Sequence, residues 1–143
     1  MSYYWISSYP HNIGDIILPG NWGNLVKNTP NHHWLHMENQ FETMRLTINP
    51  QLPSRLACAF VFEDLDTARL LQSKRTNDII YEVELLDVEK PIYRADMALI
   101  HPNLEQWDAH IGNPKKYWSN NYNEKVNWPE ILTLSRFKVI SLI

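Results

Sequence analysis

Three histidines form the densest group of chemically active side chains in the sequence, in the pattern His32-His33-x-x-His36. His32 and His36 lie one helical turn apart, and Glu38 and Glu42 follow closely, so a divalent metal ion could find ligands here. The glutamate that zinc hydrolases carry beside the first histidine is missing. Three interpretations stay open: a metal-dependent hydrolase site, a histidine that acts as a general base without metal, and an ordinary polar helix start.

Glu130 and Arg55 each stand where a loop enters an apolar segment. A carboxylate held rigidly at such an entry, with its head in a cleft, can stabilise a cation that develops during a reaction. The planar guanidinium of Arg55 could bind a phosphate or a carboxylate of a ligand. The alternative for Arg55 is a salt bridge to one of the chain's own carboxylates.

Two further pairs and one thiol have both a structural and a functional interpretation. Arg94 and Asp96 are spaced to lie on one face of a strand, where opposite charges neutralise each other more often than they bind a ligand. Tyr117 and Trp118 could anchor the core or form a wall on which a planar ligand stacks. Cys58, the single cysteine, lies in an apolar run and is expected to be a small buried side chain rather than a nucleophile.

Apolar runs predict the strands that would position these residues. At residues 79–85 apolar and polar positions alternate, so the odd-numbered residues would face the core and the even-numbered ones, Ile80 included, would face solvent. An uncharged run at 56–62 predicts a strand buried on both faces. Further strand-like segments are expected at 3–7, 16–18, 93–100, 130–134 and 137–143, the last two joined by a tight connection.

Helical spacing predicts three helices. The first spans residues 32–48, with a buried face made of Trp34, Met37, Phe41, Met44 and Ile48. The second begins at a cap, Asp64 or Asp66, ends before residues 74–77 and turns inward Ala68, Leu70 and Leu71. A short third helix would start at Asn103 and bury Leu104, Trp107 and Ile111. The Asn-rich segments 20–31 and 113–127 are expected to be long surface loops, with Tyr117 and Trp118 on a helical turn.

This order of elements predicts an α+β fold with a mostly antiparallel sheet. The 143 residues, 44% of them hydrophobic, fit one domain over residues 1–143. The sequence has four glycines and neither a GxGxxG motif nor a P-loop, so a dinucleotide could not be held through a glycine-rich turn at a helix start.

Charge and hydropathy limit the partners. A net charge of -3 argues against tight binding to a nucleic-acid backbone, because that binding needs clustered Lys and Arg. The first residues do not resemble a signal peptide, and no run of 18 apolar residues occurs, so we expect a soluble, cytoplasmic protein with no membrane partner. Six Trp, seven Tyr and four Phe are available to build a core and to stack on planar ligands.

Five segments, in order along the chain, resemble motifs of the ADP-ribosyltransferase fold, in the small form of rifampin ADP-ribosyltransferases and of toxin-like members. They are the aromatic strand 3–7, the Ile-Gly-Asp-x-Ile-Leu segment 13–18, the strand and helix start 60–68, the Tyr-Glu-Val strand 81–84 and the Glu-Ile-Leu strand 130–132. The chain also resembles an uncharacterised bacterial family grouped with that fold, through Pro-Ser-Arg at 53–55, Arg-x-Asp-Met at 94–97, Tyr-Trp at 117–118 and Glu130.

The resemblance implies an ADP-ribosyltransferase-like split, mostly antiparallel sheet and a transferase that uses NAD as substrate. Glu130 would be the catalytic residue that stabilises the charge on the ribose as nicotinamide leaves. Residues implied to bind NAD are Tyr4, Trp5, Ser7, Ser54, Arg55, Phe60, Asp96 and Trp118. Asp96 is also the position at which rifampin-modifying members would use an Asp in place of the Glu. The acceptor would be a protein, a nucleic acid or a small molecule.

The resemblance also implies a biological role for the protein and leaves open an alternative to enzymatic activity. A toxin or an effector in conflict with phage is implied by analogy, with a protein partner that neutralises it. Trp5 stands where the family usually carries Arg or His. This departure motivates the alternative of a non-enzymatic binding or inhibitory module of the same fold.

Overall fold

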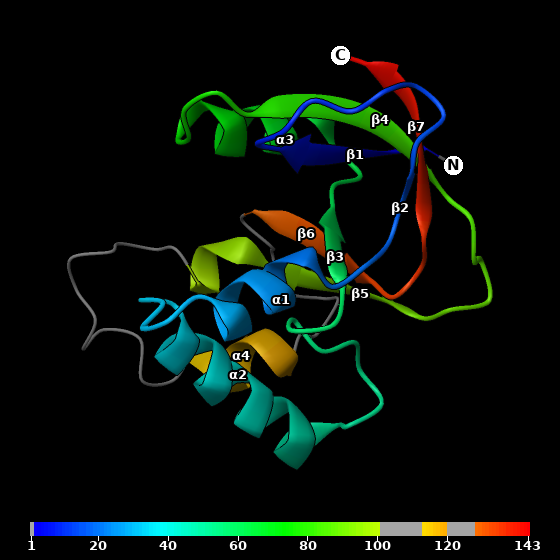
Figure 1. Cartoon of the computed structure of the whole chain (residues 1–143). Helices are drawn as coiled ribbons and strands as arrows, with labels where there is room; N and C mark the ends of the chain where they lie inside the picture. The colour runs from blue at the N-terminus through cyan, green and yellow to red at the C-terminus, as the bar shows by residue number, and fades with distance from the viewer. Residues whose placement is uncertain (1, 101–112, 120–127) are drawn as a thin grey trace.

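The computed structural model describes residues 2–100, 113–119 and 128–143, which form two antiparallel sheets and several helices (Figure 1). The first sheet has the strand order β1 (Ser2–Ser7), β4 (Ile79–Leu85), β7 (Phe137–Leu142) and β2 (Ile16–Ile17). The second has the order β3 (Ala59–Val61), β6 (Pro129–Thr133) and β5 (Ile92–Asp96). The helices are α1 (Asn21–Asn28), α2 (Leu35–Ile48), α3 (Leu65–Ser73) and α4 (Asn113–Trp118), with a 3-10 turn at Met97–Leu99. The α+β class and the antiparallel pairing are confirmed.

The first sheet is buried on both faces at its centre. Strand β4 has the predicted bounds, and Tyr81 and Val83 are buried as the alternation requires. The prediction that Ile80 faces solvent is wrong, because α3 covers that side of the sheet and leaves Ile80 only 2% exposed against Ala68. The Asp64 side chain caps α3 by accepting from the Asp66 backbone N–H, as one of the two predicted caps would. Leu70, predicted to turn inward, is exposed.

The second sheet carries α2 and α4 on one side (Figure 1). Met37 and Phe41 of α2 pack with Tyr117 and Trp118 of α4 in one core cluster, as the helical spacing predicted for α2. Strand β3 spans only three residues, because residues 55–57 form a turn before it instead of the first half of the predicted strand. Helix α2 begins at Leu35, three residues later than predicted, and leaves Ile48 exposed.

The two sheets meet at one backbone bridge. The amide of Tyr4 in β1 donates to the carbonyl of Phe62 at 2.8 Å, and the amide of Phe62 donates to the carbonyl of Tyr4 at 2.8 Å. The short connection after Thr133 leads from β6 in the second sheet to β7 in the first, so the two C-terminal strands do not pair with each other. The chain therefore crosses between the sheets four times, after β2, β3, β4 and β6.

Helix α1 replaces most of the surface loop predicted at residues 20–31. The Asn and Gly residues of this segment indicated a loop, but the segment is a helix with one buried face, on which Val26 is fully buried. Gly20 precedes the helix with φ of 105°, a conformation that favours glycine. Residues 113–118 are likewise helical rather than part of a loop, whereas the rest of that loop and the helix predicted from Asn103 lie outside the described residues. No described helix has the length and apolar character needed to cross a membrane.

Gly23 fixes the distance between α1 and the turn before β3. A Cβ atom on Gly23 would lie 1.8 Å from the carbonyl oxygen of Leu56, and backbone cannot move aside as a side-chain end can. We expect Gly23→Ala to lower the free energy of unfolding by about 1–3 kcal/mol, although alanine has the higher helix propensity. Urea unfolding would measure it, with Asn24→Ala on the exposed side of α1 as control. Equal stability of the two variants would contradict this packing.

Candidate functional site

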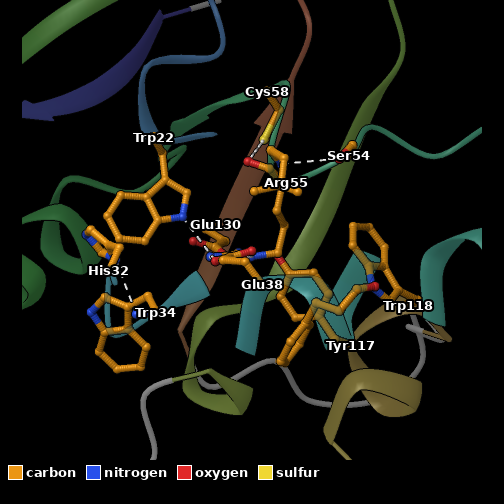
Figure 2. A network of polar contacts seen from close by, with 12 residues as sticks. Trp22, His32, Trp34, Glu38, Ser54, Arg55, Cys58, Tyr117, Trp118 and Glu130 are labelled. Atoms are coloured by element: carbon orange, nitrogen blue, oxygen red, sulfur yellow. Dashed lines mark hydrogen bonds and ion pairs between the residues drawn. The ribbon is translucent and has the colours of Figure 1, made fainter. Parts of the chain in front are cut away.

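A buried cluster of ionisable side chains lies between α2, α4 and the second sheet (Figure 2). The guanidinium of Arg55 holds Glu38 in a fork, with Nε 3.0 Å from Oε2 and Nη2 3.0 Å from Oε1. Its Nη1 donates to Glu130 Oε1 at 2.9 Å and to the Tyr117 hydroxyl at 2.8 Å. The Tyr117 hydroxyl in turn donates to Glu130 Oε1 at 2.8 Å. The alternative that Arg55 forms a salt bridge with the chain's own carboxylates is therefore right.

Local structure places each member of this network. The amides of Ala57 and Cys58 both donate to the carbonyl of Ser54, and this tight turn points Arg55 inward just before β3. Glu38 lies in the first turns of α2, beside the apolar residue Met37. Glu130 is near the start of β6, where it pairs with Ala95 of β5.

The cluster has more acidic groups than basic ones. With both carboxyls ionised, Glu38 and Glu130 would carry two negative charges against the single positive charge of Arg55. Burial raises the pKa of Glu130, and Arg55 and Tyr117 offset only part of that rise. Burial by itself would lower the pKa of Arg55. Tyr117, Glu38 and Glu130 outweigh this effect, so that the pKa lies well above its usual value. The site therefore favours a proton, or another cation, near Glu130.

A cavity of about 540 Å³ opens beside this cluster. Both sheets contribute to its wall, with Trp5, Ser7 and Phe137 from the first and Phe60 and Glu130 from the second. Its size is in the range of ligand sites. The cavity thus joins a buried carboxyl to an apolar, largely aromatic space.

Aromatic rings surround the charged groups. The indole Nε1 of Trp22 in α1 donates to Glu38 Oε1 at 3.0 Å, as Figure 2 shows, and Trp22 also lines the cavity. The ring of Phe60 lies under the Arg55 guanidinium, 4.7 Å from its carbon to the ring centroid. Trp34 adds a third aromatic wall. Such rings exclude water and can stack on a planar ligand.

The structure brings together five of the nine residues that the sequence singled out. Glu130, Arg55 and three others line the cavity: Trp5, Ser7 and Phe60. The Arg55 guanidinium is hydrogen-bonded to Glu38 and Glu130, and its implied role in NAD binding stays a prediction.

The other four predicted residues do not line the cavity. Tyr4 points to the α3 side of β1, because neighbouring residues of a strand face opposite sides. The Ser54 hydroxyl donates to Glu42 Oε2 at 2.6 Å, and Asp96 accepts from the backbone of Ala98 and Trp128. Trp118 is a core anchor whose Nε1 donates to the Phe41 carbonyl at 2.7 Å. These four residues thus lie outside the cavity wall, and their implied role in NAD binding stays a prediction.

Cavity residues that the sequence reasoning missed include Trp22, His11 and Arg75, and Glu38 was considered only as a neighbour of the histidines. For Glu38 a signal existed, since it directly follows Met37 on the predicted apolar face. Trp22 was hidden in the segment interpreted as a loop. Arg75 lines the cavity, and its guanidinium lies 3.5 Å from Asp78 Oδ2. Because the Arg75 side chain is half-exposed, its positive charge stays accessible from solvent.

The remaining candidates have structural positions. His32 and His33 stack on each other, and no group of three or more His, Cys, Asp or Glu side chains within residues 2–100, 113–119 and 128–143 could hold a metal ion. Cys58 is fully buried, and burial raises its pKa, as expected for a thiol that is not a nucleophile. Arg94 forms an ion pair with Glu63.

Removing the Arg55 charge should be the most damaging single change in the cluster. Arg55→Met would leave two buried carboxyls without their cation, and breaking a buried pair in this way typically costs about 3–5 kcal/mol. Arg94→Met, which removes a partly exposed pair, is the matched control and should cost under about 1 kcal/mol. Urea unfolding at pH 7 measures both. If the two variants lost similar amounts of unfolding free energy, the buried network would stabilise the fold no more than a partly exposed ion pair does.

The raised pKa of Glu130 predicts a pH dependence of stability. In the unfolded chain a glutamate has a pKa of about 4.3. As pH falls, the folded protein therefore binds a proton at Glu130 before the unfolded chain does. The stabilising contribution is therefore fully present below about pH 4.3 and is lost as pH rises through the folded pKa. The unfolding free energy of the wild type relative to Glu130→Gln should thus increase as pH falls from 8 to 4. Parallel curves would contradict a raised pKa, and Glu84→Gln, at an exposed position of β4, is the control.

Comparison with known proteins places these features in a family. Residues 21–143 match a family model described as a protein of unknown function (DUF2441). The matched segment runs from α1 to β7 and contains Glu38, Arg55, Tyr117 and Glu130, whereas β1 lies before it. No curated protein matches the sequence. Because the family match covers most of the chain, this chain belongs to the DUF2441 family.

Proposed function

We propose that this chain is an NAD-dependent ADP-ribosyltransferase in which Glu130 acts on the nicotinamide ribose. The observation that supports it is the position of Glu130, a buried carboxyl on the wall of an aromatic cavity. The order of motifs along the sequence and the cavity between two antiparallel sheets agree with the expected split-sheet fold. Glu130 is also the residue to which the resemblance assigns the stabilisation of the charge on the ribose, and Asp96, its alternative in rifampin-modifying members, does not line the cavity.

The charge balance of the cluster suits this substrate. NAD carries a positive charge on its planar nicotinamide ring, and the ribose carbon becomes positive as that ring leaves. Glu38 and Glu130 outnumber Arg55, so a cation entering the cavity would replace the proton that Glu130 otherwise favours. A fixed carboxylate stabilises the developing charge more than it stabilises the ground state, and this difference accelerates the reaction.

The rest of the cavity supplies binding groups for a dinucleotide. Trp5, Trp22 and Phe60 offer ring faces for the nicotinamide and the adenine. Since Arg55 is occupied by carboxylates, we assign the diphosphate to Arg75 at the cavity edge. Trp5 then acts as a stacking residue and leaves anion binding to Arg75.

Replacing Glu130 tests the proposal. Glu130→Gln removes the charge and keeps the shape, so we expect release of nicotinamide from NAD to fall by about 10²–10³-fold. Glu84→Gln, at an exposed position of β4, should retain wild-type turnover. Chromatography of nicotinamide and calorimetric titration with NAD would be run on the same samples.

The two measurements separate the candidate functions. NAD binding with no nicotinamide release by the wild type would favour a non-enzymatic module. Absence of both binding and release would reject NAD as the ligand, and equal release by wild type and Glu130→Gln would reject the role of Glu130.

A further inference from the structure

Ser7, His11 and Asp15 form a chain of polar side chains that the proposed function does not use. The Ser7 hydroxyl lies 3.0 Å from Nε2 of His11, within hydrogen-bond reach. On the other side of the ring, Nδ1 of His11 lies 3.9 Å from Oδ2 of Asp15. A histidine this close to a serine hydroxyl can take its proton, and the Asp15 carboxylate lies near the ring but beyond hydrogen-bond distance.

Neighbouring groups hold the chain in place. The backbone amide of His11 donates to the Tyr81 hydroxyl at 2.8 Å, and the ring centroid lies 4.8 Å from that of Trp5. Asp15 Oδ2 accepts from the backbone amide of Asn12 at 2.8 Å, which fixes the carboxylate beside the imidazole. His11 is therefore positioned by contacts of its ring and of its backbone amide.

The same pair faces the cavity that contains Glu130. Ser7 and His11 both line it, from the end of β1 and from the loop that follows. The Ser7 oxygen also accepts from the Tyr9 backbone amide at 3.2 Å, which leaves the hydroxyl hydrogen for His11. In the tautomer of neutral His11 that carries its proton on Nδ1, Nε2 accepts from the Ser7 hydroxyl. A hydroxyl with its base thus shares one cavity with the proposed NAD carboxylate.

We propose that Ser7 is an activated nucleophile with His11 as its base, and that it is an acceptor of ADP-ribose. The second half rests on the proposed function. The Ser7 oxygen attacks the ribose carbon, the bond from that carbon to nicotinamide breaks, and nicotinamide leaves neutral with the electron pair. The hydroxyl proton moves to His11 and then to solvent. The product is an O-glycoside on Ser7, so the protein modifies itself and fills its own cavity.

A small fluorophosphonate probe tests the nucleophile without NAD. We expect it to label Ser7, as found by peptide mass spectrometry, and His11→Gln to slow labelling by about 10²-fold or more, because Gln can accept the hydrogen bond but takes no proton. Ser2→Ala, at the exposed start of β1, and His33→Gln, outside the cavity, are the controls and should label at the wild-type rate. Absence of label on Ser7, or equal rates in His11→Gln and wild type, would overturn the nucleophile.

Incubation with NAD tests the acceptor. Nicotinamide release together with an ADP-ribose adduct on the Ser7 peptide, absent from Ser7→Ala and from Glu130→Gln, would support the proposal. Nicotinamide release with Ser7 unmodified would overturn self-modification and leave the proposed function standing. No release by the wild type would overturn the proposed function and the acceptor role together, while the labelling result would still decide whether Ser7 is a nucleophile.

Discussion

The buried charge of Arg55 is the constraint on which most of this structure depends. A guanidinium removed from water is stable only when hydrogen bonds and opposite charge surround it, and here the partners come from α2, α4 and β6. These elements therefore have to meet at one point. The turn that carries Arg55 also receives α1, whose Gly23 lies against Leu56 and whose Trp22 reaches Glu38. The position of α1 thus depends on the same network as that of the helices beneath the second sheet.

The same constraint explains why the site is suited to a cation. Stability alone would be served by one carboxylate for one guanidinium, yet Glu38 already satisfies Arg55 with two oxygens. Glu130 adds a second acid that is only partly compensated, and burial raises its pKa. A carboxyl in this state lowers its free energy when positive charge approaches. Its position on a cavity wall makes that approach available to a ligand.

Local features of the fold could be predicted from the sequence, whereas the pairing of distant segments could not. The bounds of β4 and the Asp64 cap depend on neighbouring residues, and both are confirmed. The partners of Arg55 are 17 and 75 residues away, so spacing alone could not identify Glu38. The separation of β6 and β7 into two sheets, which the tight connection between them concealed, has the same cause.

Strand parity places Trp5 and Ser7 on one side of β1 and Tyr4 on the other, although Ile6 near the end of the strand also lines the cavity. The motif that carries the resemblance contains Tyr4, Trp5 and Ser7, but a strand presents only alternate residues to one side. Trp5 and Ser7 line the cavity, whereas Tyr4 packs toward α3 and its backbone pairs with Phe62. Those two backbone hydrogen bonds connect the sheet that carries Ser7 to the sheet that carries Glu130. Main-chain contacts at Tyr4, which does not itself line the cavity, therefore hold together the two sheets from which Ser7 and Glu130 line it.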